Sequence, residues 1–147
     1  IQTAREKLNE FGIVKQSTPL LEDKGLNEFT NSILGREDDK VRIFVKDETV
    51  NPTGSFKARS PVAGYLRVDL LREGKLDQVI VLSVSTGNHG WAVSHAVKKI
   101  LERFSELKGR IEARVYMSHG TLPHKRENIH REGGVVITEI DGREIQS

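Results

Sequence analysis

A single lysine in a turn-forming run is the residue of this sequence best suited to covalent chemistry. Lys57 ends the run Asn51-Pro-Thr-Gly-Ser-Phe-Lys57, in which Pro52 fixes one φ angle and Gly54 can adopt a left-handed or close-approach conformation. A lysine in a partly desolvated site can lose its proton and attack a carbonyl to form a Schiff base. No glycine stands at the spacing of a phosphate-binding P-loop, so a nucleotide-phosphate site is the weaker interpretation.

A second loop, Ser85-Thr-Gly-Asn-His-Gly90, combines hydroxyl, amide and glycine residues. At the start of a helix such a loop offers consecutive backbone N–H groups, which suit a carboxylate or another small anion. Gly87 lets these N–H groups converge, and Ser85, Thr86 and Asn88 add polar side chains. An ordinary helix cap accounts for the same residue types, and the residues themselves leave both interpretations open.

The two loops need secondary structure that brings them together. Four segments have the pattern of strands, at 41–46, 79–82, 111–117 and 135–140. Helical patterns separate them, and strands joined by helical crossovers form a parallel sheet with right-handed connections. We therefore predict an α/β fold with an open parallel sheet of about four strands. The loops that end at Lys57, Gly90 and Leu122 should share one sheet edge, where ligands bind.

The crossover helices have recognisable limits. They are predicted over 57–74, 91–108 and 123–131. Pro61 should kink the first helix or restart it, because an interior proline removes a hydrogen bond and clashes with the preceding turn. In the last helix the run His124-Lys-Arg-Glu127 is interpreted as a solvated face. The second strand, 79–82, is a continuous aliphatic run typical of a strand buried on both faces.

The whole chain, residues 1–147, is expected to form one α/β domain. Residues 1–40 should be an N-terminal helix followed by extended and loop structure, and residues 41–147 the parallel α/β core. The helix begins at Thr3 as N-cap and stops at Gly12. From Leu21 to Lys40 the chain is polar and is interpreted as loop with little regular structure.

Composition narrows the functional classes. The 23 basic and 21 acidic residues nearly cancel and form no basic stripe, so nucleic acid is not expected as a partner. No apolar run approaches the roughly 20 residues that a membrane span needs, so no membrane partner is expected. The absence of cysteine fits a cytoplasmic protein. None of the five histidines pairs at the spacing of a helical metal site, so we expect no metal.

Taken together, the motifs resemble the N-terminal portion, including the small domain, of the fold-type II pyridoxal-phosphate enzymes. This family contains the serine and threonine dehydratases, ammonia-lyases, threonine synthase, cysteine synthase and the tryptophan synthase β chain. The resemblance rests on Ser17-Thr-Pro-Leu20, Val45-Lys-Asp-Glu48, Asn51-Pro-Thr-Gly-Ser-Phe-Lys-Ala-Arg59, Ser85-Thr-Gly-Asn-His-Gly90 and the segment from Met117 to Gly134 with Lys125. Their order and spacing match over nearly the whole chain.

The resemblance implies a cofactor, pyridoxal 5'-phosphate, and a role for each motif. Lys57 would form the Schiff base with the cofactor and would later remove the substrate α-proton. Asn88 would hydrogen-bond the phenolic oxygen of the cofactor. The loop that would hold the α-carboxylate of a small amino-acid substrate consists of Ser85, Thr86, Gly87, Asn88 and His89.

The reaction type follows less directly from the resemblance. The Asn-His-Gly sequence of the second loop is similar to the dehydratase and ammonia-lyase form, which implies a lyase that performs β-elimination. The motif around Lys57 is equally similar to threonine synthase, so a β- or γ-replacement enzyme of the threonine synthase or cysteine synthase kind is the alternative. A truncated, non-catalytic α/β module is the third hypothesis.

Two departures from the family pattern carry further expectations. Ser60-Pro61 stands where the family usually has glycine after the arginine of its lysine motif. The family's glycine-rich phosphate loop and the partner of the pyridine nitrogen would lie beyond residue 147. We therefore expect a fragment of a longer enzyme, without the second domain and inactive by itself, whose full-length form is a homo-oligomer.

Overall fold

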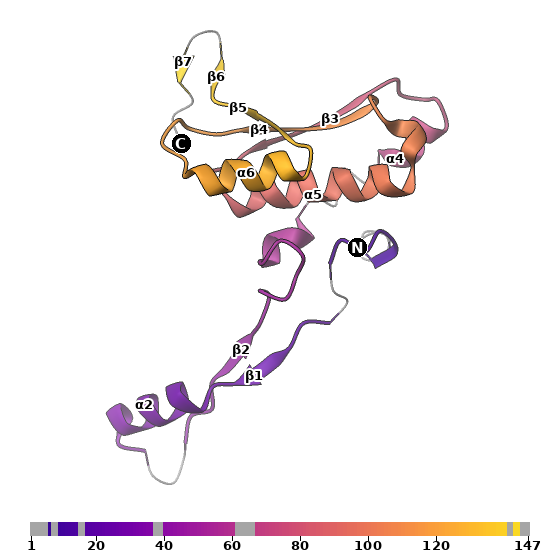
Figure 1. Ribbon diagram of the computed structural model, residues 1–147. Coiled ribbons are helices and arrows are strands. Elements are labelled where there is room, and N and C mark those ends of the chain that lie inside the picture. The colour runs from indigo at the N-terminus through magenta and orange to yellow at the C-terminus, as the bar shows by residue number, and fades with distance from the viewer. Residues whose placement is uncertain are drawn as a thin grey trace.

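The computed structural model describes residues 6, 9–14, 17–36, 40–60, 67–140 and 143–144. Its centre is a three-stranded parallel sheet in the order β3-β4-β5. The strands are β3 (Val79–Val84), β4 (Ile111–Tyr116) and β5 (Val135–Ile137). Two helices, α5 (Asn88–Arg103) and α6 (Pro123–Arg131), cover the same face of this sheet (Figure 1). The predicted fold class, parallel α/β with helical crossovers, is confirmed.

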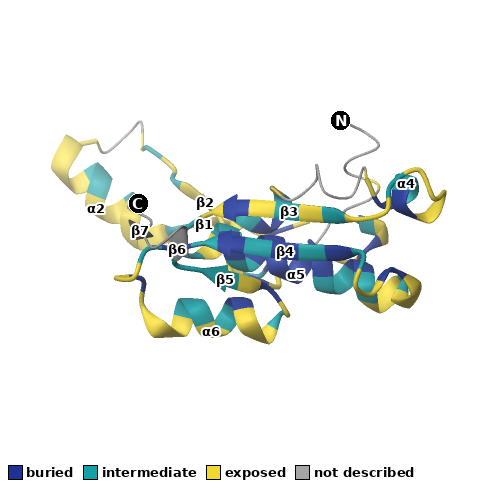
Figure 2. Cartoon of the chain, turned by 90° about the horizontal axis from the view of Figure 1, so that it is seen from above, coloured by how far each residue is buried: buried dark blue, intermediate teal, exposed yellow. Residues whose placement is uncertain are grey.

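The sheet is buried on one face. In β4 the residues Ile111, Ala113 and Val115 are buried, whereas the residues between them are half-exposed. The other face of β3 is open, and Figure 2 shows exposed residues along this strand. Leu82 and Val84 are 61% and 71% exposed. The prediction that the aliphatic run of β3 is buried on both faces is therefore wrong for the described chain, because no described element covers the second face.

The predicted strand 41–46 lies outside the parallel sheet, so this sheet has three strands among the described residues instead of about four. Only β2 (Phe44–Lys46) is extended there, and it pairs antiparallel with β1 (Leu20–Glu22). The chain reverses between these two segments, so they satisfy each other's backbone hydrogen bonds. At the other end of the chain, β6 (Glu139–Ile140) leaves β5 and pairs antiparallel with β7 (Arg143–Glu144).

The reversal between β1 and β2 contains a helix where we predicted a loop. Helix α2 spans Lys24–Leu34, and the carboxylate of Asp23 caps it by accepting the N–H of Leu26 at 2.9 Å. Gly35, in the left-handed conformation at φ 60°, ends it. Helix α2 buries none of its residues. Together with the β1-β2 pair it forms an arm that extends away from the sheet (Figure 1). We use "arm" below for residues 20–46.

The segment after the arm is built from short helices. A 3-10 helix, η1 (Phe56–Arg59), follows the predicted turn, and α4 (Val68–Arg72) precedes Gly74. The predicted kink at Pro61 lies outside the described residues. So does most of the predicted N-terminal helix, of which Glu6, Asn9 and Glu10 are described as helical.

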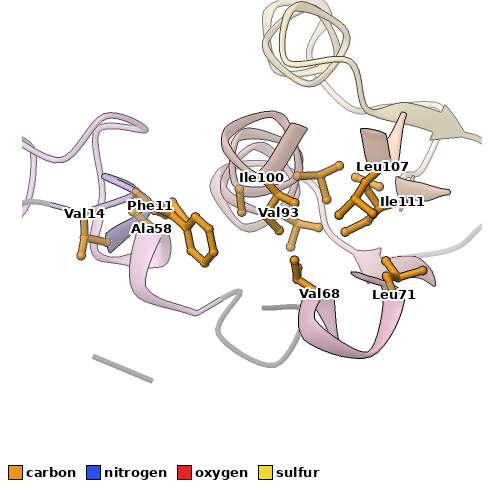
Figure 3. Packing of buried hydrophobic residues seen from close by; sticks show 13 residues of the cluster. Phe11, Val14, Ala58, Val68, Leu71, Val93, Ile100, Leu107 and Ile111 are labelled. Atoms are coloured by element: carbon orange, nitrogen blue, oxygen red, sulfur yellow. The ribbon is translucent and has the colours of Figure 1, made fainter. Parts of the chain in front are cut away.

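The core lies between α5 and the sheet, and the flanking segments close it (Figure 3). Val93, Ala96, Val97 and Ile100 of α5 are buried against Ile111 and Ala113 of β4. Further buried side chains come from the N-terminal segment, from η1, from α4 and from η2 (Ser105–Leu107); they are Phe11, Ile13, Val14, Ala58, Val68, Leu71 and Leu107. This core positions the N-terminus of α5 beside η1. No helix of the described residues is long and apolar enough to cross a bilayer.

Candidate active site

An open pocket of about 530 Å³ lies where η1, the start of α5 and the carboxyl ends of β3 and β4 meet. Its lining is Ser55, Phe56, Lys57, Val84, Ser85, Thr86, Gly87, Asn88, His89, Tyr116, Ser118 and Lys125. All six residues that we predicted to form the site are in this list. Two segments separated by more than 25 residues of chain therefore contribute to one cavity, although the functional role of each residue remains a prediction.

Lys57 reaches the pocket from η1. Ser55 caps η1 by accepting the N–H of Lys57 at 3.3 Å, so the lysine lies in the first turn of a short helix. Its ammonium lies 4.7 Å from the centroid of the Phe56 ring, a cation–π contact that orients the side chain. We predicted that Lys57 follows a strand of the parallel sheet, which is wrong, because that strand lies in the arm. Packing of η1 against α5 brings the lysine to the sheet edge instead.

Glu48 ties the turn before Lys57 to the rest of the chain. Its carboxylate accepts hydrogen bonds from Arg59 Nε at 3.0 Å, from Thr18 Oγ1 at 2.7 Å and from Asn51 Nδ2 at 2.7 Å. The ion pair with Arg59, followed by the bonds from Thr18 and Asn51, lowers the pKa of Glu48 to about 2. Three of the motifs that carry the family resemblance thus meet at one carboxylate.

The loop before α5 is shaped by its own serine. Ser85 Oγ accepts the backbone N–H groups of Gly87 and Gly90, both at 3.1 Å, and the Ser85 N–H donates to the carbonyl of Tyr116 at 3.0 Å. At Gly90 a Cβ would lie 2.5 Å from Val115 Cγ1, so only glycine lets α5 pack this closely on β4. The loop is therefore held at the end of the sheet before any ligand binds, as an anion site requires.

His89 connects this loop to the lysine turn. Its Nδ1 lies 2.8 Å from Ser60 Oγ, and the Ser60 hydroxyl donates to the carbonyl of Lys57 at 2.7 Å. Since Ser60 has one hydroxyl proton, His89 Nδ1 is the donor in their bond. Burial, followed by the charge of Lys57, lowers the pKa of His89 below its ordinary value, so the ring is neutral at pH 7. Ser60, a departure from the family pattern, thus bridges the two loops.

Six pocket residues were absent from the predicted site: Ser55, Phe56, Val84, Tyr116, Ser118 and Lys125. We interpreted the run containing Lys125 as a solvated face, which is wrong for Lys125 and for Arg126. Lys125 is half-buried and extends over Gly87, while Arg126 donates to the carbonyls of Ser118 and His119. The signal available in the sequence was the position of Lys125 in the first turn of a helix at the ligand-binding edge of the sheet.

The groups in the pocket fit an aldehyde ligand that also carries negative charge. Lys57 offers an amine, Asn88 an amide, and Ser55 and Ser85 hydroxyl groups. Among the described residues, no aspartate or glutamate lines the pocket. Its volume is within the range of about 300 to 1,000 Å³ found for small-molecule sites. Pyridoxal phosphate, an aldehyde with a phosphate group and a phenolic oxygen, meets these requirements.

Comparisons with known proteins agree with this chemistry. The family model described as pyridoxal-phosphate dependent enzyme matches residues 15–144. The chain is 34% identical over 98 residues to the 2-amino-4-ketopentanoate thiolase beta subunit of an unknown prokaryotic organism, a match that covers 64% of this chain and 18% of that protein. It is 31% identical over 103 residues to a provisionally named threonine dehydratase of Sinorhizobium fredii, covering 70% of this chain and 26% of the relative.

A solved structure shows the same fold. A pyridoxal 5'-phosphate-dependent aspartate racemase matches with a TM-score of 0.64 and 24% identity, over 92% of this chain and 35% of that protein. The chain thus spans between 18% and 35% of the length of these three proteins. Because the family model covers most of the sequence and the pocket offers the groups that the cofactor needs, this chain belongs to the family of pyridoxal-phosphate dependent enzymes.

Proposed function

We propose that this chain is the lysine-bearing part of a lyase of the dehydratase or ammonia-lyase type, which removes a β-substituent from a small amino acid. The observation that carries the proposal is the single pocket shared by Lys57 and the loop Ser85–His89. An amine that can bond to an aldehyde and a loop that can hold a carboxylate are the two groups that an amino-acid enzyme of this family needs side by side.

Each residue has a distinct part in the proposed reaction. Lys57 would hold the cofactor through its amine, and its Nζ would take the substrate α-proton. When bound, pyridoxal phosphate supplies an electron sink for the electron pair that this proton leaves behind. Asn88 would donate a hydrogen bond to the phenolic oxygen of the cofactor. The loop would orient the α-carboxylate so that the α-proton faces Lys57, through N–H groups other than those of Ser85 and Gly87, which donate within the protein.

Elimination is favoured over replacement by the Asn88-His-Gly90 sequence of the loop. In a replacement enzyme a second substrate must enter after the β-substituent leaves. The His89 ring, held by Ser60, lines the same pocket as Lys57, and we expect it to occupy space that such a second substrate would need. Replacement of the threonine synthase or cysteine synthase kind is the alternative, and a product assay on the longer protein separates the two. Elimination yields a keto acid and ammonia, whereas replacement yields a new amino acid.

The attachment of the cofactor can be tested on the chain itself. Purified chain is mixed with pyridoxal phosphate, reduced with borohydride and mapped by mass spectrometry. We expect one pyridoxyl group per chain, on Lys57, because this lysine stands in the motif that resembles the Schiff-base motif of the family and lines a pocket without a described carboxylate. The other lysine of the pocket, Lys125, should stay unlabelled. Lys57→Ala should lose that label. Lys108→Ala, which removes an exposed lysine directly after η2, is the matched control and should keep it.

Scattered labelling over surface lysines, with no preference for Lys57, would contradict the proposal for this chain. It would favour the non-catalytic α/β module, which predicts a solvated Lys57 and no response to the cofactor.

A further inference from the structure

Lys125 stands out because the proposed mechanism gives it no part, although it lines the pocket and lies against the loop Ser85–His89. It comes from the first turn of α6, whose N-terminal residue is Pro123. A Cβ on Gly87 would lie 3.0 Å from Lys125 Nζ and 3.3 Å from its Cδ. The ammonium group therefore rests directly on the bare α-carbon in the middle of the loop Ser85–His89. A side chain at position 87 would press on this lysine.

The charges of the pocket single out this ammonium group. Among the described residues that line the pocket, Lys57 and Lys125 are the only side chains charged at pH 7, because His89 is neutral. Lys57 is committed to the cofactor in the proposed function. Within the described part of the chain, no aspartate or glutamate forms an ion pair with Lys125. A half-buried ammonium group without a carboxylate partner is suited to an anionic ligand.

The position of Lys125 also indicates where in the site an anion would bind. It lies on the loop itself, and it separates the main pocket from a smaller neighbouring one lined by Thr86, Ser118, Gly120, Thr121, Leu122 and Lys125. An anion bound to the loop N–H groups would therefore meet the ammonium on the α6 side. In the proposed function that anion is the α-carboxylate of the substrate.

We propose that Lys125 is a substrate-binding residue that forms an ion pair with the α-carboxylate held by the loop Ser85–His89. This inference rests on the proposed function, because it takes the loop as the carboxylate site. It adds a fixed positive charge to a site that otherwise consists of neutral N–H and hydroxyl groups. The consequence is a selectivity for amino acids over the corresponding amines that depends on one side chain.

Two unreactive probes test this selectivity. N-phosphopyridoxyl-L-alanine and N-phosphopyridoxyl-ethylamine differ only in the carboxylate, and their affinities for the chain are measured by isothermal titration calorimetry. We expect the wild-type chain to prefer the alanine compound. In Lys125→Gln this preference should fall about fivefold to tenfold, as for the loss of one charge-assisted bond. Lys125→Arg should keep most of it, and Lys108→Gln, with the same change of charge far from the site, should keep all of it.

The outcomes separate this inference from the proposed function. An equal loss of affinity for both compounds in Lys125→Gln would overturn the inference, since Lys125 would then contact the phosphate or only support the loop. So would an unchanged preference in Lys125→Gln, or a wild-type chain that binds neither compound. Pyridoxal phosphate labelling of Lys57 is measured on the same variants. Lost labelling with an intact, Lys125-dependent preference would count against the proposed function alone.

Discussion

Among single residues, Glu48 makes the contacts that fix the turn before Lys57. Its pKa of about 2 lies below the ordinary value of 4.5, because Arg59, Thr18 and Asn51 stabilise the charged form. A lowered pKa in the folded state means that the stabilisation is complete above pH 4.5 and is lost as the pH falls from there toward 2. Glu48→Gln should therefore be less stable than the wild type at pH 7. We expect this difference, measured by urea unfolding, to shrink steadily below pH 4.5.

An exposed glutamate provides the matched control for this pH dependence. Glu102 pairs with Lys99 on the surface of α5, where an ion pair contributes little. At every pH in this range, the urea midpoint of Glu102→Gln should be nearly the same as that of the wild type. A stability difference between Glu48→Gln and wild type that stayed constant down to pH 2 would show that the carboxylate charge is not what holds the turn.

At the scale of elements, the contact between α5 and β4 decides where the carboxylate loop lies. A methyl group at Gly90 would lie 2.5 Å from Val115 Cγ1 and 3.3 Å from Ile129 Cδ1, so the helix would have to move away from the sheet. Gly90→Ala should therefore lower the free energy of unfolding by about 1–3 kcal/mol, the usual cost of overpacking a core. Thermal unfolding followed by circular dichroism measures the change.

Gly120→Ala is the control for this contact. A Cβ at Gly120 meets no heavy atom within 4 Å, and the φ angle of this residue is not positive, so the stability should change by no more than about 0.5 kcal/mol. If the two alanine variants were equally stable, the close approach of α5 to β4 would be wrong, and with it the position of the loop.

For the whole molecule, the contrast between the arm and the sheet predicts two levels of stability. The arm buries none of the residues of β1, α2 or β2, and its Phe29 and Ile33 are 63% and 67% exposed. Backbone hydrogen bonds in a segment without buried contacts open easily. We expect amides of the arm to exchange with solvent much faster than those of α5 and β4, as measured by hydrogen exchange with mass spectrometry.

The apolar surface of the arm could be covered by a second copy of the chain at high concentration. The exchange experiment is therefore repeated over a dilution series. If the arm amides exchanged slowly at every concentration, the prediction would be wrong. The single chain would then protect these amides through contacts other than the described ones.

Local signals in the sequence were sufficient for several features. The helix predicted over 123–131 has the bounds of α6, because Pro123 at its start and the glycines after it are short-range signals. The loop Ser85–Gly90 was predicted at the start of a helix for the same kind of reason. In the arm the local signals conflict: Asp23 and Gly35 are caps that favour the helix α2, whereas the polar composition between them favours a loop.

The sequence by itself determined which residues can do chemistry here, because a lysine turn and a hydroxyl-rich loop are properties of short segments. Tertiary structure decided three things that depend on partners far along the chain. Strand β2 pairs with β1 instead of the parallel sheet, η1 packs on α5 and brings Lys57 to the loop, and Lys125 extends over Gly87. Each is a contact between segments more than 20 residues apart, and no local pattern specifies which distant surface a side chain will meet.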